Sequence, residues 1–192
     1  MNKMISVSEK TTAVQEKAAQ SISDNAIVTP IVSFIGNSNS GKTTLLEKVV
    51  AELKILGYRV ATVKHTPHGC DIDHPGKDTW RLARAGSDIV VLSSSDRFAF
   101  IERLDDELSL DQIRETIGGK VDVILAEGYK SSEIPKVVVR NTGQRAASLK
   151  NGGEVLVTIS AQLSDTGAPQ FDPRDVADIV SLLVELIGQR AD

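Results

Sequence analysis

Two spacings of apolar residues alternate along most of the chain. Short β-branched and aliphatic runs, such as I-V-S-F-I at 31–35, predict buried strands of a parallel sheet. Between these runs, apolar residues recur every three or four positions, as in Leu45, Leu46, Val49 and Leu53, which predicts amphipathic helices. The predicted strands are 31–35, 58–64, 89–92, 97–103, 121–126, 136–140 and 155–159.

Capping residues place the helix ends. The first helix follows a glycine-rich loop and ends at Gly57, and a short helix runs from 78 to 85. Ser109 with Gln112 three residues later predicts a capping box for a helix that ends at Gly118. Asp172 followed by Pro173 predicts the N-cap and first residue of the last helix.

The alternation of strands and helices predicts the fold class. It is an α/β fold of the P-loop NTPase type, with a mostly parallel sheet and helices on both faces. We expect one nucleotide-binding domain at 30–192. Residues 1–29 are polar, rich in Ser, Thr and Gln, and carry few large apolar groups, so we expect a flexible N-terminal extension.

Composition limits the kinds of partner and the cellular compartment that we expect. The chain has 192 residues and a formal net charge of −4, which disfavours a general nucleic-acid-binding role. No apolar run approaches the length of a membrane span, and the first residues lack the apolar stretch of a signal peptide. The single cysteine fits a reducing compartment, so we expect a cytoplasmic protein with no membrane partner.

The segment G-N-S-N-S-G-K-T at 36–43 matches the P-loop pattern G-x-x-x-x-G-K-[ST] in full. Its glycines let backbone N–H groups point at phosphate oxygens, and the following helix adds its partial positive charge. The lysine supplies a charge for the β- and γ-phosphates, and the threonine hydroxyl is placed to bind Mg²⁺. The alternative is an ordinary Gly/Ser-rich turn. The residues expected to bind the nucleotide are Gly36, Asn37, Ser38, Asn39, Ser40, Gly41, Lys42, Thr43 and Thr44.

Two carboxylates flank the strand predicted at 121–126. Glu127 ends it, where a carboxylate could face the P-loop and hold Mg²⁺, directly or through water. A solvated strand end is the alternative. Asp122 is a weaker candidate, because it begins the strand and should lie at the opposite edge of the sheet. Lys42 and Glu127 are the expected catalytic residues, and Thr43, Glu127 and Asp73 are the expected metal ligands.

The loop 65–78 concentrates three histidines, one cysteine and three aspartates. A transition-metal site is conceivable, but no C-x-x-C or H-x-x-x-H spacing supports one. We favour a nucleotide-sensing loop, with Asp71 or Asp73 near Mg²⁺ and His65 or Lys64 near a phosphate. A solvated loop is the remaining alternative.

A basic stripe follows this loop. Lys77, Arg81 and Arg84 fall on one helical face, which is more often a solvated face than an anion site. Trp80 between them is interpreted as a packing residue.

Taken together, these motifs resemble the MobB family, molybdopterin-guanine dinucleotide biosynthesis protein B. The P-loop alone is generic. The specific features are K-H-T at 64–66, D-x-D-x-P-G-K-D at 71–78, A-R-A-G at 83–86 and A-E-G-Y-K at 126–130. The likeness covers residues 30–140 and leaves the first 29 residues outside the family core.

The resemblance implies a homodimeric protein that binds GTP and Mg²⁺ and hydrolyses GTP slowly. It also implies a partner, a MobA-like nucleotidyltransferase that attaches GMP to molybdopterin. By the same likeness, Gly41, Lys42 and Thr43 bind phosphates and Mg²⁺, and Glu127 is the Walker B carboxylate. The N-K-x-D signature that reads guanine in many GTPases is absent, so the preference for GTP rests on resemblance alone.

The residues themselves leave two other functions open. One is a small-molecule kinase or ligase that uses the same P-loop, with its acceptor near Lys77 and Arg81. The other is a GTP-driven metallochaperone. Its candidate metal ligands are His65, His68, Cys70 and His74.

Overall fold

The computed structural model describes residues 28–66, 69, 72–141, 153–161 and 170–188. Strands and helices alternate along most of these segments, as the sequence predicts. Their bounds are β1 (Ile31–Ile35), α2 (Lys42–Ile55), β2 (Val60–Lys64), α3 (Asp78–Arg84), β3 (Ile89–Ser93), β4 (Phe98–Glu102), α4 (Leu110–Ile117), the 3₁₀ turn η1 (Gly118–Lys120), β5 (Val123–Glu127), β6 (Lys136–Val139), β7 (Val155–Ile159), β8 (Gln170–Phe171) and α5 (Val176–Gly188).

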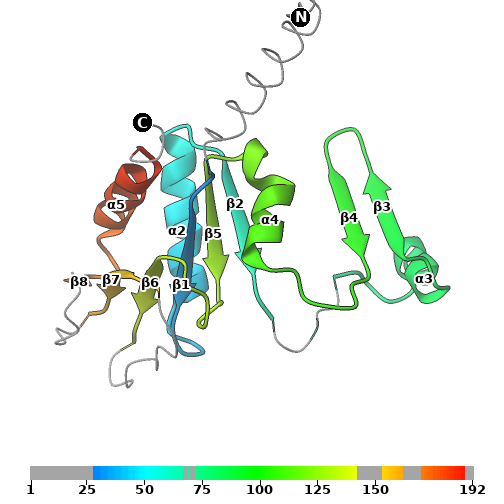
Figure 1. The fold of residues 1–192 in the computed structure, drawn as a ribbon, viewed down its shortest axis with the longest axis horizontal. Coiled ribbons are helices and arrows are strands. Elements are labelled where there is room, and N and C mark those ends of the chain that lie inside the picture. The colour runs from blue at the N-terminus through cyan, green and yellow to red at the C-terminus, as the bar shows by residue number, and fades with distance from the viewer. Residues whose placement is uncertain (1–27, 67–68, 70–71, 142–152, 162–169, 189–192) are drawn as a thin grey trace, which may run out of the picture.

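Across the described segments, six strands form one sheet in the order β2-β5-β1-β6-β7-β8. Every adjacent pair in it runs parallel, so the loops after β1, β2 and β5 all leave from one edge (Figure 1). This carboxyl edge is where α/β folds bind ligands. The predicted α/β class is confirmed.

The two faces of the sheet carry different helices. Val32 and Phe34 of β1 and Leu125 of β5 pack with α2 and α5 in the larger core cluster. The alternate positions, including Ile31 and Ile124, pack with α4 in a smaller cluster. Alternation of side chains along a strand produces this division, and full burial of one such aliphatic side chain contributes about 1.5–3 kcal/mol. The prediction of helices on both faces is confirmed.

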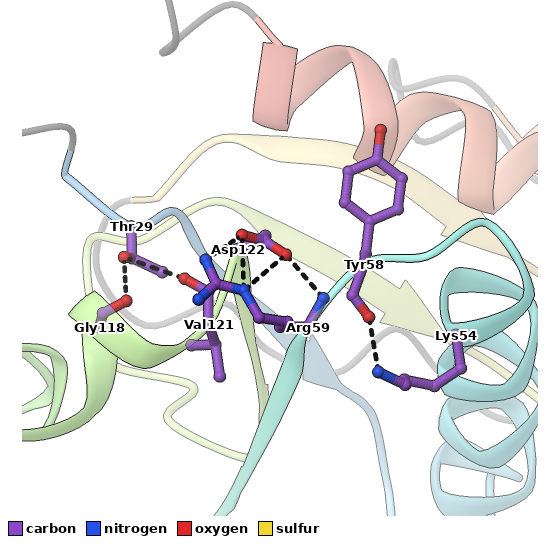
Figure 2. A network of polar contacts seen from close by, with 7 residues as sticks. All are labelled: Thr29, Lys54, Tyr58, Arg59, Gly118, Val121 and Asp122. Atoms are coloured by element: carbon purple, nitrogen blue, oxygen red, sulfur yellow. Dashed lines mark hydrogen bonds and ion pairs between the residues drawn. The ribbon is translucent and has the colours of Figure 1, made fainter.

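Polar contacts close the amino edge of the sheet (Figure 2). Arg59 precedes β2 and Asp122 precedes β5, and the Arg59 Nη2 donates to Asp122 Oδ1 at 2.6 Å. Asp122 also accepts the backbone N–H of Arg59 at 2.7 Å. The Thr29 hydroxyl donates to the carbonyl of Gly118 at 2.7 Å. Asp122 therefore lies at the edge opposite the P-loop, as predicted.

Strands β3 and β4 form a separate antiparallel hairpin. With α3 they stand apart from the six-stranded sheet (Figure 1). The sequence predicts both strands, but not that they leave the main sheet. Large apolar residues are exposed on the hairpin. Val91, Phe98 and Phe100 are 49%, 71% and 53% exposed.

The predicted start of the last helix is wrong. Helix α5 begins at Val176, and Asp172 instead forms a turn in which its carboxylate accepts the backbone N–H of Arg174 at 2.8 Å. The Arg174 guanidinium bonds to the same carboxylate, and these contacts lower the pKa of Asp172 to about 2. An Asp carboxylate can accept the N–H two residues later in a turn as well as at the start of a helix. Local sequence therefore does not distinguish the two.

No helix among the described residues is long and apolar enough to span a membrane.

Candidate functional site

The loop between β1 and α2 has a backbone that only some residues can adopt. Gly41 has φ +89°, and Asn39 has φ +61°, in the left-handed region that glycine and asparagine tolerate best. At Gly36, a Cβ atom would lie 2.6 Å from the Ser40 hydroxyl and would collide with the carbonyl of Val139. The motif glycines are therefore required by this loop geometry.

Polar groups of this loop fit a phosphate ligand. Helix α2 begins at Lys42. The residue at its N-cap position is Gly41, which has no side chain to pair with the first N–H groups of the helix. The Ser40 hydroxyl is buried and has no hydrogen-bond partner among the described residues. Unpaired helix-terminal N–H groups and a buried orphan hydroxyl are donors that phosphate oxygens satisfy.

Lys42 lies across the start of the loop. Its ammonium donates to the carbonyl of Asn37 at 2.7 Å and lies 3.4 Å from that of Gly36. Burial lowers the pKa of Lys42, Glu127 opposes this shift, and nearby Lys130 and Lys64 lower the pKa further. A half-buried cation with two lysines and only one carboxylate acting on it favours an added anion.

Thr43 at the start of α2 contacts Glu127 at the end of β5. The Thr43 hydroxyl donates to Glu127 Oε2 at 3.1 Å. Glu127 ends β5, beside β1, and by alternation it shares the face of Val123 and Leu125, which pack toward α2. Two adjacent oxygen ligands beside a phosphate loop suit Mg²⁺, which would neutralise phosphate charge there. The structure thus brings together Lys42, Thr43 and Glu127.

Lys64 ends the edge strand β2, in register with Glu127. Its ammonium lies 3.8 Å from Glu127 Oε2, and its side chain is 67% exposed while that of Glu127 is 17% exposed. Lys64, Thr43 and Glu127 line a cavity of about 460 Å³ between α2 and β2. The rest of the lining is mostly apolar: Leu46, Glu47, Val50, Thr62, Val63 and Leu125.

His65 holds the turn that follows Glu127. Its N–H donates to the Glu127 carbonyl at 3.0 Å, and its ring lies 4.9 Å from that of Tyr129. Its Nε2 is 3.1 Å from Glu107 Oε1. Gly128 has φ +106°, and a Cβ there would lie 3.0 Å from His65 Cβ. His65 therefore contacts the Glu127 turn, and of the two phosphate neighbours predicted, His65 or Lys64, it is Lys64 that lines the cavity with Thr43.

Asp73 is placed away from these residues. It lines a second cavity with Trp80 and Val90, beside α3 and the hairpin, and its Oδ1 accepts the His74 N–H at 2.8 Å. Within this structure it does not join Thr43 and Glu127. Asp71, His68 and Cys70 lie outside the described residues. In the part of the chain that is described, no three His, Cys, Asp or Glu residues cluster as a metal site.

The basic stripe on α3 is exposed to solvent. Arg81 lies 3.8 Å from Asp78, and the Arg84 guanidinium sits 5.5 Å from the centre of the Trp80 ring. Trp80 is half-buried against the cavity shared with the hairpin, which agrees with its interpretation as a packing residue.

Similarity to known proteins identifies the family of this chain. Residues 31–162 match the model of a family described as MobB, molybdopterin guanine dinucleotide synthesis protein B. The chain belongs to the MobB family. Its place is therefore in the synthesis of molybdopterin guanine dinucleotide.

Two curated MobB relatives show how far the likeness extends. An Escherichia coli molybdopterin-guanine dinucleotide biosynthesis adapter protein is 34% identical over 161 residues, which cover 81% of this chain and 92% of that protein. A Haemophilus influenzae protein of the same name is 39% identical over 111 residues. That match covers 57% of this chain and 62% of the relative.

Solved MobB structures share the fold. A crystal structure of molybdopterin-guanine biosynthesis protein B superposes with a TM-score of 0.68 at 28% identity, covering 82% of this chain and 98% of that one. The MobB homologue from Bacillus stearothermophilus gives a TM-score of 0.64 at 25% identity, covering 83% and 98%.

Sequence reasoning offered Lys64 as a phosphate neighbour in this MobB chain, but it missed Lys130 and the effect of both lysines on Lys42. Lys130 and Lys64 both act electrostatically on Lys42, yet neither belongs to the P-loop motif. The available signal was position, since Lys64 ends one predicted strand and Lys130 follows another closely. Only the strand order shows that these two strands are neighbours.

Proposed function

We propose that this MobB chain is a nucleotide-dependent accessory protein that binds GTP with Mg²⁺ and hydrolyses it slowly. The observation that carries the proposal is the joint placement of Lys42, Thr43 and Glu127 at the carboxyl edge of the sheet, next to a loop with unpaired donors. Thr43 and Glu127 hold the metal, and the P-loop backbone with Lys42 holds the phosphates.

Its partner in this proposal is a MobA-like nucleotidyltransferase that acts on molybdopterin. Support comes from the names of the E. coli and H. influenzae relatives, which are called adapter proteins of this biosynthesis. An adapter need not carry the transfer chemistry itself. We place it in the cytoplasm, in keeping with its single cysteine.

Equilibrium binding of GTP and ATP, each with Mg²⁺ and with chelator, tests the nucleotide part. We expect Mg²⁺-dependent binding of GTP in preference to ATP. A Lys42→Ala variant serves as the matched control, because it removes one phosphate contact of the P-loop. Equal binding of both nucleotides by the wild type would remove the base preference, and no binding would refute the proposal.

The adapter role is tested by adding the chain to a MobA-like enzyme supplied with molybdopterin and GTP. Formation of the dinucleotide should rise with the wild-type chain and GTP. It should rise less with Lys42→Ala. The same rise with both proteins would show that nucleotide binding is not what assists the partner.

We propose further that the protein is a homodimer that buries its hairpin. Alternation along β3 and β4 turns Val90 and Ile101 toward the cavity shared with α3, and leaves Val91, Phe98 and Phe100 on the opposite face, exposed. An exposed apolar patch of this kind marks an interaction surface.

Light scattering after gel filtration tests the dimer. Phe98→Asp should shift the protein toward monomer, while Ile55→Asp, at a position 76% exposed at the end of α2, should not. A dimer that is unchanged by Phe98→Asp would move the interface elsewhere.

A further inference from the structure

Lys64 occupies a position that the P-loop motif does not explain. It ends the edge strand β2, in register with Glu127 at the end of β5. Both residues share the face of the sheet on which Val60 and Leu125 pack toward α2. The Lys64 side chain therefore lines the cavity that it shares with Thr43 and Glu127 from the side of β5 that is opposite β1.

The contact between Lys64 and Glu127 is loose. Their charged atoms are 3.8 Å apart, and Lys64 donates no hydrogen bond shorter than this to Glu127. Two-thirds of the Lys64 side chain is exposed, whereas Glu127 is largely buried. An ion pair of this kind is weak and easily exchanged, because its cation gives up little when it returns to water or moves to another anion.

More than one group competes for the negative charge of Glu127. It accepts the Thr43 hydroxyl at 3.1 Å and lies near Lys64, and it is the carboxylate proposed to hold Mg²⁺. A dication is a stronger partner for a carboxylate than one exposed ammonium. Once Glu127 binds the metal, Lys64 can pair with another anion, and a phosphate bound at Lys42 is such an anion, because Lys64 already acts electrostatically on Lys42.

We infer that Lys64 selects a nucleoside triphosphate over a diphosphate: it neutralises Glu127 in the empty site and contacts the γ-phosphate when Mg²⁺ is held by Glu127. This inference rests on the proposed function, since it requires binding of nucleotide with Mg²⁺. It adds a second lysine, supplied by β2, to the phosphate contacts of Lys42. A flexible ammonium suits both roles, because it can turn between two anions a short distance apart.

The test compares GTP and GDP affinities of Lys64→Met and Lys64→Arg with the wild type, in Mg²⁺ and in chelator. Lys64→Met keeps an unbranched side chain only one atom shorter and removes its charge. Lys48→Met is the matched control, since Lys48 is exposed on α2 outside the cavity lining. In Mg²⁺, Lys64→Met should weaken GTP about tenfold and GDP much less, and Lys64→Arg should restore the preference.

Other outcomes overturn the inference. If Lys64→Met changes GTP and GDP affinities by the same factor, Lys64 only neutralises Glu127. If neither affinity changes, Lys64 has no part in the site. A wild type that binds no nucleotide would refute the proposed function, whereas normal wild-type binding with an unselective variant would refute this inference alone.

Chemical labelling of lysines gives a second readout that does not depend on affinity. With an amine-reactive reagent and mass spectrometry, Lys64 should be modified readily in the empty protein and in GDP with Mg²⁺. Its labelling should fall in saturating GTP with Mg²⁺, while Lys48 labelling stays constant. Equal labelling of Lys64 in GDP and GTP would contradict a contact with the γ-phosphate.

Discussion

Strands β2 and β5 carry an ion pair at each end, and the two pairs differ in design. At the amino edge, Arg59 and Asp122 meet at 2.6 Å, and the carboxylate also accepts the Arg59 N–H (Figure 2). At the carboxyl edge, Lys64 and Glu127 are 3.8 Å apart. In both pairs the basic residue lies at an end of β2 and the acidic residue at an end of β5.

The two edges therefore differ in whether they can accept a ligand. We call the amino edge, at Arg59 and Asp122, the closed edge and the carboxyl edge, at Lys64 and Glu127, the open edge. Arg59 engages Asp122 through its planar guanidinium and its backbone N–H, which leaves that carboxylate little capacity for a ligand. Glu127 has one hydroxyl partner and a distant ammonium, and the P-loop at the same edge holds a buried Ser40 hydroxyl without a partner in the described structure. The same two strands thus form one edge at which the carboxylate is fully paired and another at which a ligand can pair with the remaining polar groups.

The largest effect should come from Lys42 at the open edge. Lys42→Ala removes a charge-assisted phosphate contact in a partly buried position, so we expect a loss of at least about 1–2 kcal/mol in triphosphate binding, roughly tenfold. Titration calorimetry with GTP and Mg²⁺ measures it, and circular dichroism checks that the variant is folded. An unchanged affinity in a folded variant would remove the P-loop from the function.

Thr43→Ala and Glu127→Gln should give the next largest effects, and only with metal. Both residues supply oxygen atoms to the proposed Mg²⁺ site, so each variant should lose more GTP affinity in Mg²⁺ than in chelator. The measurement is the ratio of the two dissociation constants. A loss of equal size in both conditions would mean that these side chains contact phosphate and not metal.

Much of the fold was predictable because burial leaves a local pattern. The run I-V-S-F-I forms β1 with the predicted bounds, and Ser109 with Gln112 forms the predicted capping box. The start of α5 was not predictable, because Asp172 bonds to Arg174 in a turn that uses the same residues as a helix cap. The separation of the β3–β4 hairpin depends on tertiary packing, which strand propensity does not report.

Less of the site was predictable. The P-loop and Glu127 could be found, since a motif and a strand end identify them. The contact of Lys64 with Glu127 could not, because it requires β2 to neighbour β5 rather than β1, and strand order is a property of the whole sheet. The expectation that Asp73 binds the metal remains a prediction without support from its position beside α3.

The closed edge should respond to substitution in stability and not in binding. Hydrogen bonds from Arg59 lower the pKa of Asp122, so this carboxylate stabilises the fold above its unfolded pKa, about 3.9, and the contribution disappears as pH falls through the lower folded value. Asp122→Asn should lower the Tm by a few degrees near neutral pH and leave GTP affinity unchanged. The difference in Tm from the wild type should shrink below about pH 4. A constant difference down to acid pH would mean that charge is not what the pair contributes.

The smallest effect should come from the N-terminal segment, and it depends on where the chain is cut. Residues 1–27 carry little large apolar surface, so their removal should leave Tm and GTP affinity nearly unchanged. Removal of 1–29 also deletes Thr29, which is 8% exposed and whose hydroxyl donates to the Gly118 carbonyl at the closed edge. That second truncation should lower the Tm by a few degrees, because it leaves a carbonyl of the η1 turn without its partner.

Differential scanning calorimetry of the two truncated proteins measures this contrast. Thr29→Val in the shorter truncation is the matched control, since it removes the hydroxyl and keeps the volume, and it should reproduce most of the loss seen on cutting at residue 29. If deletion of 1–27 alone lowers the Tm by several degrees, that segment packs on the domain or on a second subunit. The predicted boundary near residue 30 would then have to move toward the N-terminus, because polar composition would have failed to identify a segment that contributes to the core or to a dimer interface.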